Sequence, residues 1–441
     1  MNLQINSERL MSELRQLARV TDCPATEDRS LPEPTQAVTR IVFTPRDLEA
    51  RAWIKLLAAD AGFSVREDAI GNTFVRWNGT DNSLGAVGTG SHTDAIPHAG
   101  MYDGTVGVLG GLEAMRALKE SGFQPKRSLE LLMFTSEEPT RFGIGCIGSR
   151  LLGGVLEPDA ADRLPDRLPE TEPGAPTGLT VRDVREAAGF RGELASLKLP
   201  RGYYDAWVEL HIEQGPLLER DGVDLGIVTN IAAPASYRFT VEGFGGHAGA
   251  LLMQDRKDAL CAAAEMVLSV ERHALEANAR AKSQAESGVD TVATVGTMLI
   301  HPGAVNSVPS RVQLMLDIRD TDVQRRDGVM DALRSDIREI EGRRGVRVSE
   351  ELINADQPAI SDAKIIAALE DACRAEGVSY RKMVSRAYHD TSFMAPIAPV
   401  AMLFIPCRNG VSHRPDEYAS PEAIARGTRV LAMALAALSA A

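Results

Sequence analysis

Two histidines and two aspartates fall within one short stretch, residues 89–104, TGSHTDAIPHAGMYDG. The four side chains are those of His92, Asp94, His98 and Asp103, and the glycines and the proline around them predict a loop. The stretch includes the end of the apolar run LGAVGTG, which is typical of a buried strand. In α/β proteins, residues at the carboxyl ends of strands form binding and catalytic sites. Imidazole and carboxylate groups at such a position predict a divalent metal site.

A second pair of acids, Glu137 and Glu138, ends the apolar run SLELLMFTSEE. Neighbouring residues of a strand point in opposite directions, so one acid can bind a metal ion while the other moves a proton at the same site. A solvated surface position is the alternative for this pair. Asp103 also has two interpretations, as a ligand and as the N-cap of the helix that follows it. We expect His98 to be a pocket wall rather than a ligand.

Two further histidines follow strand-like runs: His211 comes after AWVEL, and His413 lies in the turn NGVSHRPDE after VAMLFIP. Three imidazoles and two carboxylates at strand ends suit two divalent ions, zinc, manganese or cobalt, that are bridged by one aspartate. The set contains no thiolate, which disfavours a structural zinc site. Asp94 lies two residues beyond His92, where its carboxylate can accept the second ring N–H. The predicted ligands are His92, Asp103, Glu138, His211 and His413.

A competing motif occurs in GFGGHAGA, where Gly243, Gly245 and Ala248 satisfy the GxGxxA pattern of dinucleotide-binding loops. A single match of this kind is weak evidence. The sequence predicts no helix directly after it, and His247 occupies the loop. We therefore expect no dinucleotide cofactor.

The overall composition limits the partners of this protein. Among 441 residues the formal net charge is −13 and aromatic residues make up 5%, which argues against nucleic acid as a partner. The five cysteines are scattered and form no CxxC pair, as expected of reduced thiols in a reducing compartment. The sequence shows no signal-peptide core and no apolar run of membrane-span length. We therefore expect a cytoplasmic protein that does not associate with membranes.

Strand-like and helix-like segments alternate from residue 44 onward. Residues 44–62 and 103–122 have helical spacing, and short apolar runs lie between and after them. This alternation predicts an α/β fold with a mixed, mostly parallel sheet and flanking helices. Residues 157–179 are rich in proline and acids, and we expect a surface excursion with little regular structure there.

A different pattern begins near residue 226. Two strands are expected within 226–246, a helix over about 255–281, two more strands, and a charged helix near 322–344. The order β-α-β-β-α-β is typical of a ferredoxin-like α+β domain. We therefore predict a catalytic domain in two parts, residues 1–228 and 349–441, interrupted by an inserted domain at 229–348.

Several motifs together resemble those of the hydantoinase/carbamoylase amidases, a group of dinuclear metallopeptidase-like hydrolases. The resemblance runs from about residue 40 to the C-terminus. It implies a zinc-peptidase-like catalytic domain and an insert that acts as a lid and dimerisation domain. The motifs are GSHTDAIPHAGMYDG, FTSEEPTRFG, ELHIEQGPLLE, GGHAGA, HPGAVNSVPSR, LDIRD and GVSHRPDEYASPE.

The resemblance implies a role for each candidate site residue. One metal ion would be held by His92, Asp103 and His211, and the other by Asp103, Glu138 and His413. The catalytic roles would be those of a general base and acid for Glu137, an orienting group for Asp94, and an oxyanion donor in the partner subunit's site for His247. The substrate contacts would be Asn306 and Arg319 to a carboxylate, and Gln214 and His389 to a ureido group.

Within this family the resemblance is greatest to members that hydrolyse ureidoglycolate, on FTSEEPTRFGIGCIGSRLL, IAAPAS, SRAYHDTSFMA and FIPCRNGVSHRPDEYASPE. It implies cleavage of a small ureido acid to glyoxylate, ammonia and carbon dioxide by a homodimer. Two divalent ions per subunit are implied, Mn²⁺ first, with Zn²⁺ or Co²⁺ as alternatives. An N-carbamoyl-L-amino acid or allantoate is the alternative substrate.

Overall fold

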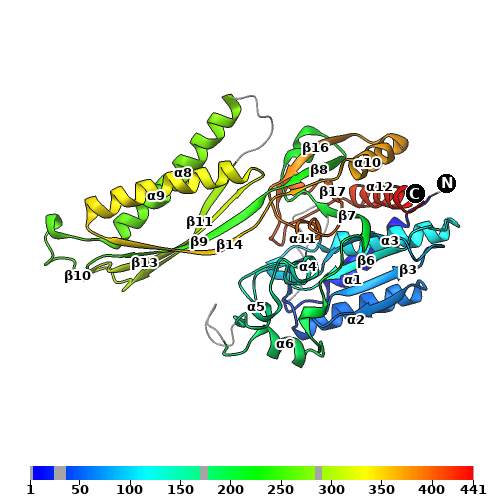
Figure 1. The fold of residues 1–441 in the computed structure, drawn as a ribbon, viewed down its shortest axis with the longest axis horizontal. Coiled ribbons are helices and arrows are strands. Elements are labelled where there is room, and N and C mark those ends of the chain that lie inside the picture. Colours follow the sequence, from blue (N-terminus) through cyan, green and yellow to red (C-terminus); the bar gives the residue numbers. More distant parts are fainter. Residues whose placement is uncertain (1–2, 24–35, 169–176, 284–290, 441) are drawn as a thin grey trace. The chain divides into compact units, whose positions relative to one another are not determined.

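The computed structural model describes residues 3–23, 36–168, 177–283 and 291–440 (Figure 1). The chain forms two compact units. The first contains Met1–Thr229, Ile360–Met383 and His389–Ala441, and the second contains Asn230–Ala359 and Val384–Tyr388. The chain therefore leaves the first unit after its central strands and completes it with C-terminal elements.

A nine-stranded mixed sheet forms the centre of the first unit. Its order is β15-β8-β17-β7-β4-β6-β3-β2, with β16 paired to β8. The neighbours β17, β7, β4 and β6 are parallel, while β2, β3 and β8 run antiparallel to their partners. The strands are β2 (Ser64–Glu67), β3 (Thr73–Trp77), β4 (Ala86–His92), β6 (Leu129–Phe134), β7 (Tyr204–Ile212), β8 (Leu225–Ile231), β15 (Ala359–Ile360), β16 (Tyr380–Ser385) and β17 (Val400–Ile405).

Both faces of the central strands are buried, which explains why β6 and β17 are almost continuously apolar. In β6, Leu129, Leu131 and Met133 belong to one hydrophobic cluster, whereas Leu132 and Phe134 belong to the other. The first cluster includes residues of α1 (Ser7–Ala18), α2 (Pro45–Asp60), α3 (Thr105–Glu120), α10 (Ala363–Glu376) and α12 (Pro421–Ala440). The second includes residues of α4 (Ile147–Gly153), α5 (Pro158–Asp162), α6 (Val181–Ala187) and α11 (Asp390–Met394). The α/β fold expected from the sequence is confirmed.

The last helix, α12, differs from the sequence expectation because its length and composition would allow it to cross a membrane. However, 61% of its most apolar 18-residue window is buried inside the protein. Ile424, Leu431 and Leu435 share a hydrophobic cluster with the strands β7 and β17. The apolar character of α12 is therefore explained by its place in the core of the first unit.

The second unit is built on a four-stranded antiparallel sheet in the order β11-β13-β9-β14. Its elements follow the predicted order β-α-β-β-α-β, and Figure 1 shows α8 and α9 over one face of the sheet. Alternate residues of β13, Val312, Leu314 and Leu316, pack in a cluster with residues of both helices. The elements are β9 (Ala233–Glu242), α8 (Ala259–Ser283), β11 (Val292–His301), β13 (Arg311–Asp320), α9 (Val323–Arg344) and β14 (Arg347–Ala355).

Three local expectations differ from the structure. The two strands expected within 226–246 do not pair, because β8 lies in the sheet of the first unit and β9 in that of the second. The predicted loop at 89–104 contains β5 (Ala95–Ala99), which pairs with β1 (Val38–Arg40). The excursion at 157–179 contains the short helix α5, although residues 169–176 lie outside the described chain.

A glycine of α3 lets this helix approach the strands that carry the candidate ligands. A Cβ atom on Gly107 would lie 2.5 Å from the carbonyl oxygen of Leu210 in β7 and 2.6 Å from the Cβ of Ser91 in β4. Real Cβ atoms do not approach other atoms this closely, so any side chain at this position would push the helix away from the sheet.

We predict that Gly107→Ala lowers the free energy of unfolding by about 1–3 kcal/mol, the usual cost of overpacking. Gly328→Ala in α9 is the matched control, because its Cβ would meet no atom within 4 Å. That change should raise stability by about 0.4–1 kcal/mol through the unfolded state. Urea unfolding of both variants measures the two effects, and a rise in stability for Gly107→Ala would contradict the close approach.

Candidate active site

The candidate ligands lie at the carboxyl edge of the parallel strands in the first unit. His92 is the last residue of β4, His211 is the penultimate residue of β7, and Glu138 follows β6 by four residues. Asp103 lies just before α3, and His413 lies in the loop after β17. Because parallel strands end at the same edge, residues far apart in the chain meet there.

Asp103 is the centre of this arrangement. Its Oδ1 atom lies 3.1 Å from His211 Nε2 and 3.6 Å from His92 Nε2. Its Oδ2 atom lies 3.1 Å from His413 Nε2, which lies 3.2 Å from Glu138 Oε1. The candidate ligand atoms of His92, Asp103 and His211 lie within 4.8 Å of one another, and so do those of Asp103, Glu138 and His413. The structure thus brings the five residues together as two donor groups that share one aspartate.

Glu137 lies beside both groups. Its Oε2 atom is 3.6 Å from His92 Nε2, and its Oε1 atom accepts a hydrogen bond from the Cys146 thiol at 3.5 Å. Only 9% of Glu137 is exposed. Glu138 is also buried, with 6% exposed. The alternative interpretation of this pair as solvated surface acids is therefore wrong. One carboxylate oxygen of Glu137 is held by the protein while the other faces the imidazole.

Asp94 contacts the His92 ring, as the sequence predicts, but through its backbone carbonyl and not through its carboxylate. The hydrogen bond to His92 Nδ1 is made by the backbone carbonyl of Asp94 at 3.0 Å, whereas the nearest carboxylate contact is 3.8 Å away. The carboxylate instead accepts the backbone N–H groups of Glu137 at 3.3 Å and Glu138 at 3.0 Å. Burial raises the pKa of Asp94 to about 6. This one residue therefore ties the end of β4 to the acids that follow β6.

Gln214 and His389 also lie at this edge of the sheet. Gln214 donates a hydrogen bond from Nε2 to Asp103 Oδ2 at 2.8 Å, and its backbone φ is +54°. Its Oε1 atom is buried and has no hydrogen-bond partner in the described part of the chain. The His389 ring lies edge-on to the ring of His211, with 4.6 Å between the centroids. Both residues are thus placed beside the donor groups.

Asp103 is held by residues that sequence reasoning did not single out. Glu417 Oε1 accepts the backbone N–H groups of Tyr102 at 2.8 Å and Asp103 at 3.0 Å. Ser412 donates to Asp103 Oδ2 at 3.0 Å or to Glu417 Oε2 at 2.8 Å. Burial raises the pKa of Glu417 to about 7. In the sequence, the only hint of this role is that Glu417 lies four residues after His413. A solvated acid in a turn would occupy the same kind of position.

Asp103 does not cap α3, which is the other interpretation of its position. The helix begins at Thr105, and its N-cap is Gly104, with φ +65° and no side-chain cap hydrogen bond. A Cβ on Gly104 would lie 2.5 Å from the His92 ring. The glycine therefore gives the imidazole its space and leaves the aspartate side chain to the histidines.

A buried acid network lies next to His211 and His389, since ligand atoms of Glu209 and of both imidazoles lie within 4.8 Å of one another. Glu209 accepts hydrogen bonds from Ser91 at 2.8 Å and from the Thr391 hydroxyl at 2.6 Å. Asp390 accepts one from Ser149 at 2.5 Å. Burial and the charge of Glu209 raise the pKa of Asp390 well above its usual value. These residues fix the strand ends behind the donor groups.

The acids and imidazoles of the site share protons strongly. Burial raises the pKa of Glu137 well above its usual range. Burial also raises the pKa of Asp103, but hydrogen bonds from three imidazoles outweigh it and hold that pKa well below its ordinary value. Hydrogen bonds to Asp103 and Glu138 raise the pKa of His413 to about 11. A metal ion needs its ligands deprotonated, so it would displace the protons held between these groups.

The donor set fits a pair of divalent cations. It consists of imidazole nitrogens and carboxylate oxygens, the mixture suited to zinc, manganese or cobalt. In the described chain, the ion-pair partners of Asp103, Glu137 and Glu138 are imidazoles, which carry positive charge only while they hold protons. His413 closes the set from the solvent side, with 46% of its side chain exposed.

Three predicted site residues belong to the second unit. His247 lies in β10 (Gly246–His247), which pairs with β12 (Ser307–Val308), and the backbone carbonyl of Asn306 accepts the N–H of Ala248 at 2.8 Å. Arg319, near the end of β13, donates to Asp317 at 2.6 Å. Its guanidinium lies 5.5 Å from the centre of the Tyr388 ring. His247 and Asn306 are thus neighbours within this unit.

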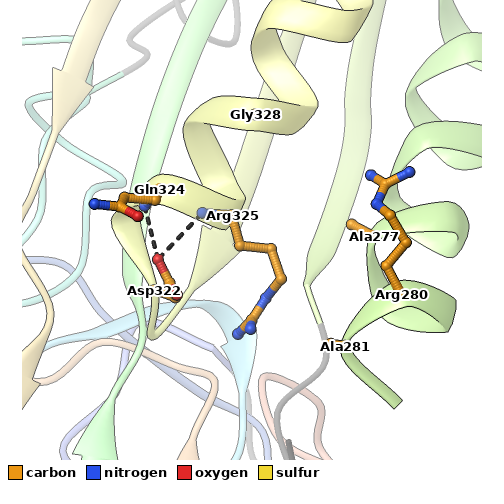
Figure 2. Close-up of a pocket in the computed structure, with 7 residues that line it drawn as sticks. All are labelled: Ala277, Arg280, Ala281, Asp322, Gln324, Arg325 and Gly328. Atoms are coloured by element: carbon orange, nitrogen blue, oxygen red, sulfur yellow. Dashed lines mark hydrogen bonds between the residues drawn. The ribbon is translucent and has the colours of Figure 1, made fainter. Parts of the chain in front are cut away.

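Other candidate features are not built for catalysis. The GxGxxA match contains β10 and is followed by a short 3-10 helix, while the next α-helix begins at Ala259. His98 is exposed and contacts Cys23, with 3.1 Å between Nδ1 and Sγ, so the pocket-wall interpretation is not supported by its contacts. A cavity of about 360 Å³ lies between the ends of α8 and α9 (Figure 2). Its acid, Asp322, caps α9.

Comparison with known proteins agrees with this geometry. The profile of peptidase family M20/M25/M40 matches residues 88–437. The chain is 48% identical over 439 residues to a ureidoglycolate hydrolase from Oryza sativa subsp. japonica, covering 99% of this chain and 85% of that protein. It is 34% identical to the N-carbamoyl-L-amino acid amidohydrolase of Geobacillus stearothermophilus, with 97% of each chain covered.

The fold is also similar to that of a relative whose structure has been solved. The crystal structure of AtUAH in complex with glyoxylate has a TM-score of 0.85 and 46% identity, covering 99% of this chain and 98% of that one. AtUAH has also been solved with (S)-hydroxyglycine.

The chain belongs to the peptidase M20/M25/M40 family. The resemblance inferred from the motifs is therefore confirmed, together with the α/β fold and the hydrolase class. Enzymes of the M20 family are metal-dependent, and the two donor groups around Asp103 are candidate metal sites of this member.

Proposed function

We propose that this protein is an amidohydrolase that cleaves the ureido C–N bond of ureidoglycolate. The observation that carries the proposal is the pair of donor groups sharing Asp103, with Glu137 buried beside them. The choice of substrate is supported by the similarity to ureidoglycolate hydrolases over almost the whole chain. Hydrolysis would release ammonia and carbon dioxide, and the hydroxyglycine formed would collapse to glyoxylate and a second ammonia.

In this proposal His92, Asp103 and His211 hold one divalent ion, and Asp103, Glu138 and His413 hold the other. When bound, such a pair polarises a carbonyl oxygen and lowers the pKa of water, which is the chemistry that a poorly electrophilic ureido carbon needs. Mn²⁺ is the ion we propose first, with Zn²⁺ and Co²⁺ as alternatives. A donor set of carboxylate oxygens and imidazole nitrogens can bind each of the three ions. Asp94 keeps the His92 ring oriented through its carbonyl.

Glu137 is the proton carrier in this scheme. It takes a proton from the attacking water and delivers it to the leaving nitrogen, as general base and then general acid. Cys146 holds Oε1, so Oε2 is the oxygen that faces the donor groups. The buried position of Glu137 keeps bulk water from competing for this proton.

The remaining residues would bind the substrate. The unpartnered Oε1 of Gln214 can accept a ureido N–H, and His389 lies at the same edge. Arg319 suits the substrate carboxylate because its planar fork can bind two oxygens at once. Asn306 and His247 would bind the carboxylate and the developing oxyanion, respectively.

The activity is tested by removing metal with a chelator, restoring Mn²⁺, Zn²⁺ or Co²⁺ in turn, and measuring ammonia release. We expect activity to vanish without metal and to return most fully with Mn²⁺. The panel compares kcat/KM for ureidoglycolate, allantoate and N-carbamoyl-L-amino acids. A preference of about tenfold or more, some 1.4 kcal/mol, for a carbamoyl amino acid would replace the proposed substrate.

We predict that Glu137→Gln lowers kcat by about 10²–10⁴-fold, the usual contribution of a general base, while bound metal is retained. Glu130→Gln is the matched control, because Glu130 is also buried and lies on β6, where it accepts a hydrogen bond from Tyr204 at 2.6 Å. Its kcat should stay close to that of the wild type. Full activity in Glu137→Gln with normal metal content would eliminate the proposed proton carrier.

We also propose that the protein is a cytoplasmic homodimer formed through the second unit, which acts as a lid. The edge strand β11 exposes Leu299 and Ile300, with 66% and 41% of each residue accessible, and an exposed apolar edge favours pairing with another chain. The five free cysteines support a reducing location.

If His247 acts in the partner subunit's site, two inactive variants should complement each other. Mixing Glu137→Gln with His247→Ala under conditions that exchange subunits should restore about a quarter of wild-type activity, because half of the dimers are mixed and each has one complete site. Ammonia release and a tagged pull-down measure activity and exchange together. Mixed dimers that stay inactive would show that His247 does not serve the partner.

A further inference from the structure

Arg40, the last residue of β1, is a buried cation directly behind the candidate metal site. It is 1% exposed. Its Nε atom donates to the carbonyl of Thr93 at 2.7 Å, and Nη1 donates to the carbonyls of Leu17 at 2.9 Å and Val20 at 2.8 Å. One guanidinium therefore joins the end of α1 to the peptide between Thr93 and Asp94.

The hydrogen bond from Arg40 to Thr93 matters because of where Thr93 lies in the chain. Thr93 links His92, a candidate ligand, to Asp94, whose carbonyl accepts the His92 Nδ1 hydrogen bond. The register of β1 and β5 places Arg40 opposite Ala95, the residue after Asp94. A shift of the Thr93 peptide would therefore change the orientation of the imidazole and the carboxylate that holds the backbone of Glu137.

Arg40 differs from Arg51, another buried arginine near these strand ends. Arg51 forms an ion pair with Asp47 at 2.9 Å, whereas the acceptors of Arg40 in the described chain are backbone carbonyls. Burial lowers the pKa of Arg40 to about 10, against the opposing charges of Asp47 and Asp94, so it is still a cation at neutral pH. A buried cation without an ion pair is costly, and α1 partly compensates because the carbonyls at a helix end carry partial negative charge.

We propose that Arg40 is a positioning residue of the metal site, which holds the Thr93 peptide so that His92 and Asp94 keep the geometry needed to bind metal. The inference rests on the proposed metal site, since it concerns the affinity of that site for its ions. Partners that orient metal ligands from behind typically contribute 10- to 100-fold to metal affinity. Arg40 acts through the backbone, so its effect should appear in metal binding even without substrate.

The test compares Arg40→Lys and Arg40→Met with a matched control, Arg185→Lys. Arg185 is 2% exposed and donates to Asp162 at 2.9 Å and to the carbonyls of Ala69 and Phe190 at 3.2 and 3.1 Å. Its acceptors are outside the loops that carry the candidate ligands. The measurements are the dissociation constant of Mn²⁺ for the metal-free full-length protein, by competition with a fluorescent chelator, and the thermal midpoint of the metal-free protein.

We expect both Arg40 variants to bind Mn²⁺ about tenfold or more weakly than the wild type, and Arg185→Lys to bind within about twofold of it. The thermal midpoints of Arg185→Lys and Arg40→Lys should fall by similar amounts, because both changes weaken a buried hydrogen-bond network. Lysine retains the charge at position 40 but not the planar fork, so Arg40→Lys separates geometry from charge.

The inference is overturned if folded Arg40 variants bind Mn²⁺ as tightly as the wild type. It is also overturned if neither variant folds with or without Mn²⁺, because the role of Arg40 would then be structural only. Failure of the proposed function has a different signature, namely that the wild-type protein itself binds no Mn²⁺, Zn²⁺ or Co²⁺.

Discussion

The structure depends on one unfavourable arrangement, three acids gathered in a buried space at the end of a parallel sheet. Asp103, Glu137 and Glu138 are each less than a tenth exposed, and their ion-pair partners are imidazoles. Buried carboxylates close to one another cannot all ionise without positive charge nearby. Divalent cations satisfy that requirement, whereas the imidazoles alone satisfy it only by holding protons. The apolar layers on both faces of the sheet are what keep these groups together despite the cost.

The loops that carry these three acids are held in place by backbone hydrogen bonds to the carboxylates of two further buried acids. Asp94 accepts the N–H groups of Glu137 and Glu138, and Glu417 accepts those of Tyr102 and Asp103. Each acid thereby fixes the loop that carries a donor group. Preorganisation of this kind matters because a site built before the ligand binds loses little free energy to rearrangement.

Much of this could be predicted from the sequence because the ligands lie at strand ends. The alternation of apolar strands and helices identified the α/β fold, and the types of His92, Asp103 and His211 at strand ends indicated a metal site. The topology of β9, α8, β11, β13, α9 and β14 also followed from periodicity. The strand β8 was misassigned because an apolar strand carries no mark of the sheet it joins, and pairing depends on contacts distant in sequence.

Some supporting contacts could not be predicted from the sequence, for a physical reason. Asp94 was expected to orient His92 through its carboxylate, but the contact is made by its backbone carbonyl. Every residue has a backbone carbonyl, so the side-chain type could not reveal this contact. Glu417 and Arg40 are charged residues of types that are usually solvated, and only the fold buries them.

Arg319 shows how the same reasoning would extend to the substrate contact proposed for this residue. Its guanidinium is already paired with Asp317 and lies over Tyr388. A substrate carboxylate that binds Arg319 therefore gains only the difference between its own contact and the one it shares or replaces. Under that proposal the affinity for a small acid would be moderate, while the contacts with Asp317 and Tyr388 orient the guanidinium before the substrate binds. Such a site favours a ligand that matches the planar fork over one that merely carries negative charge.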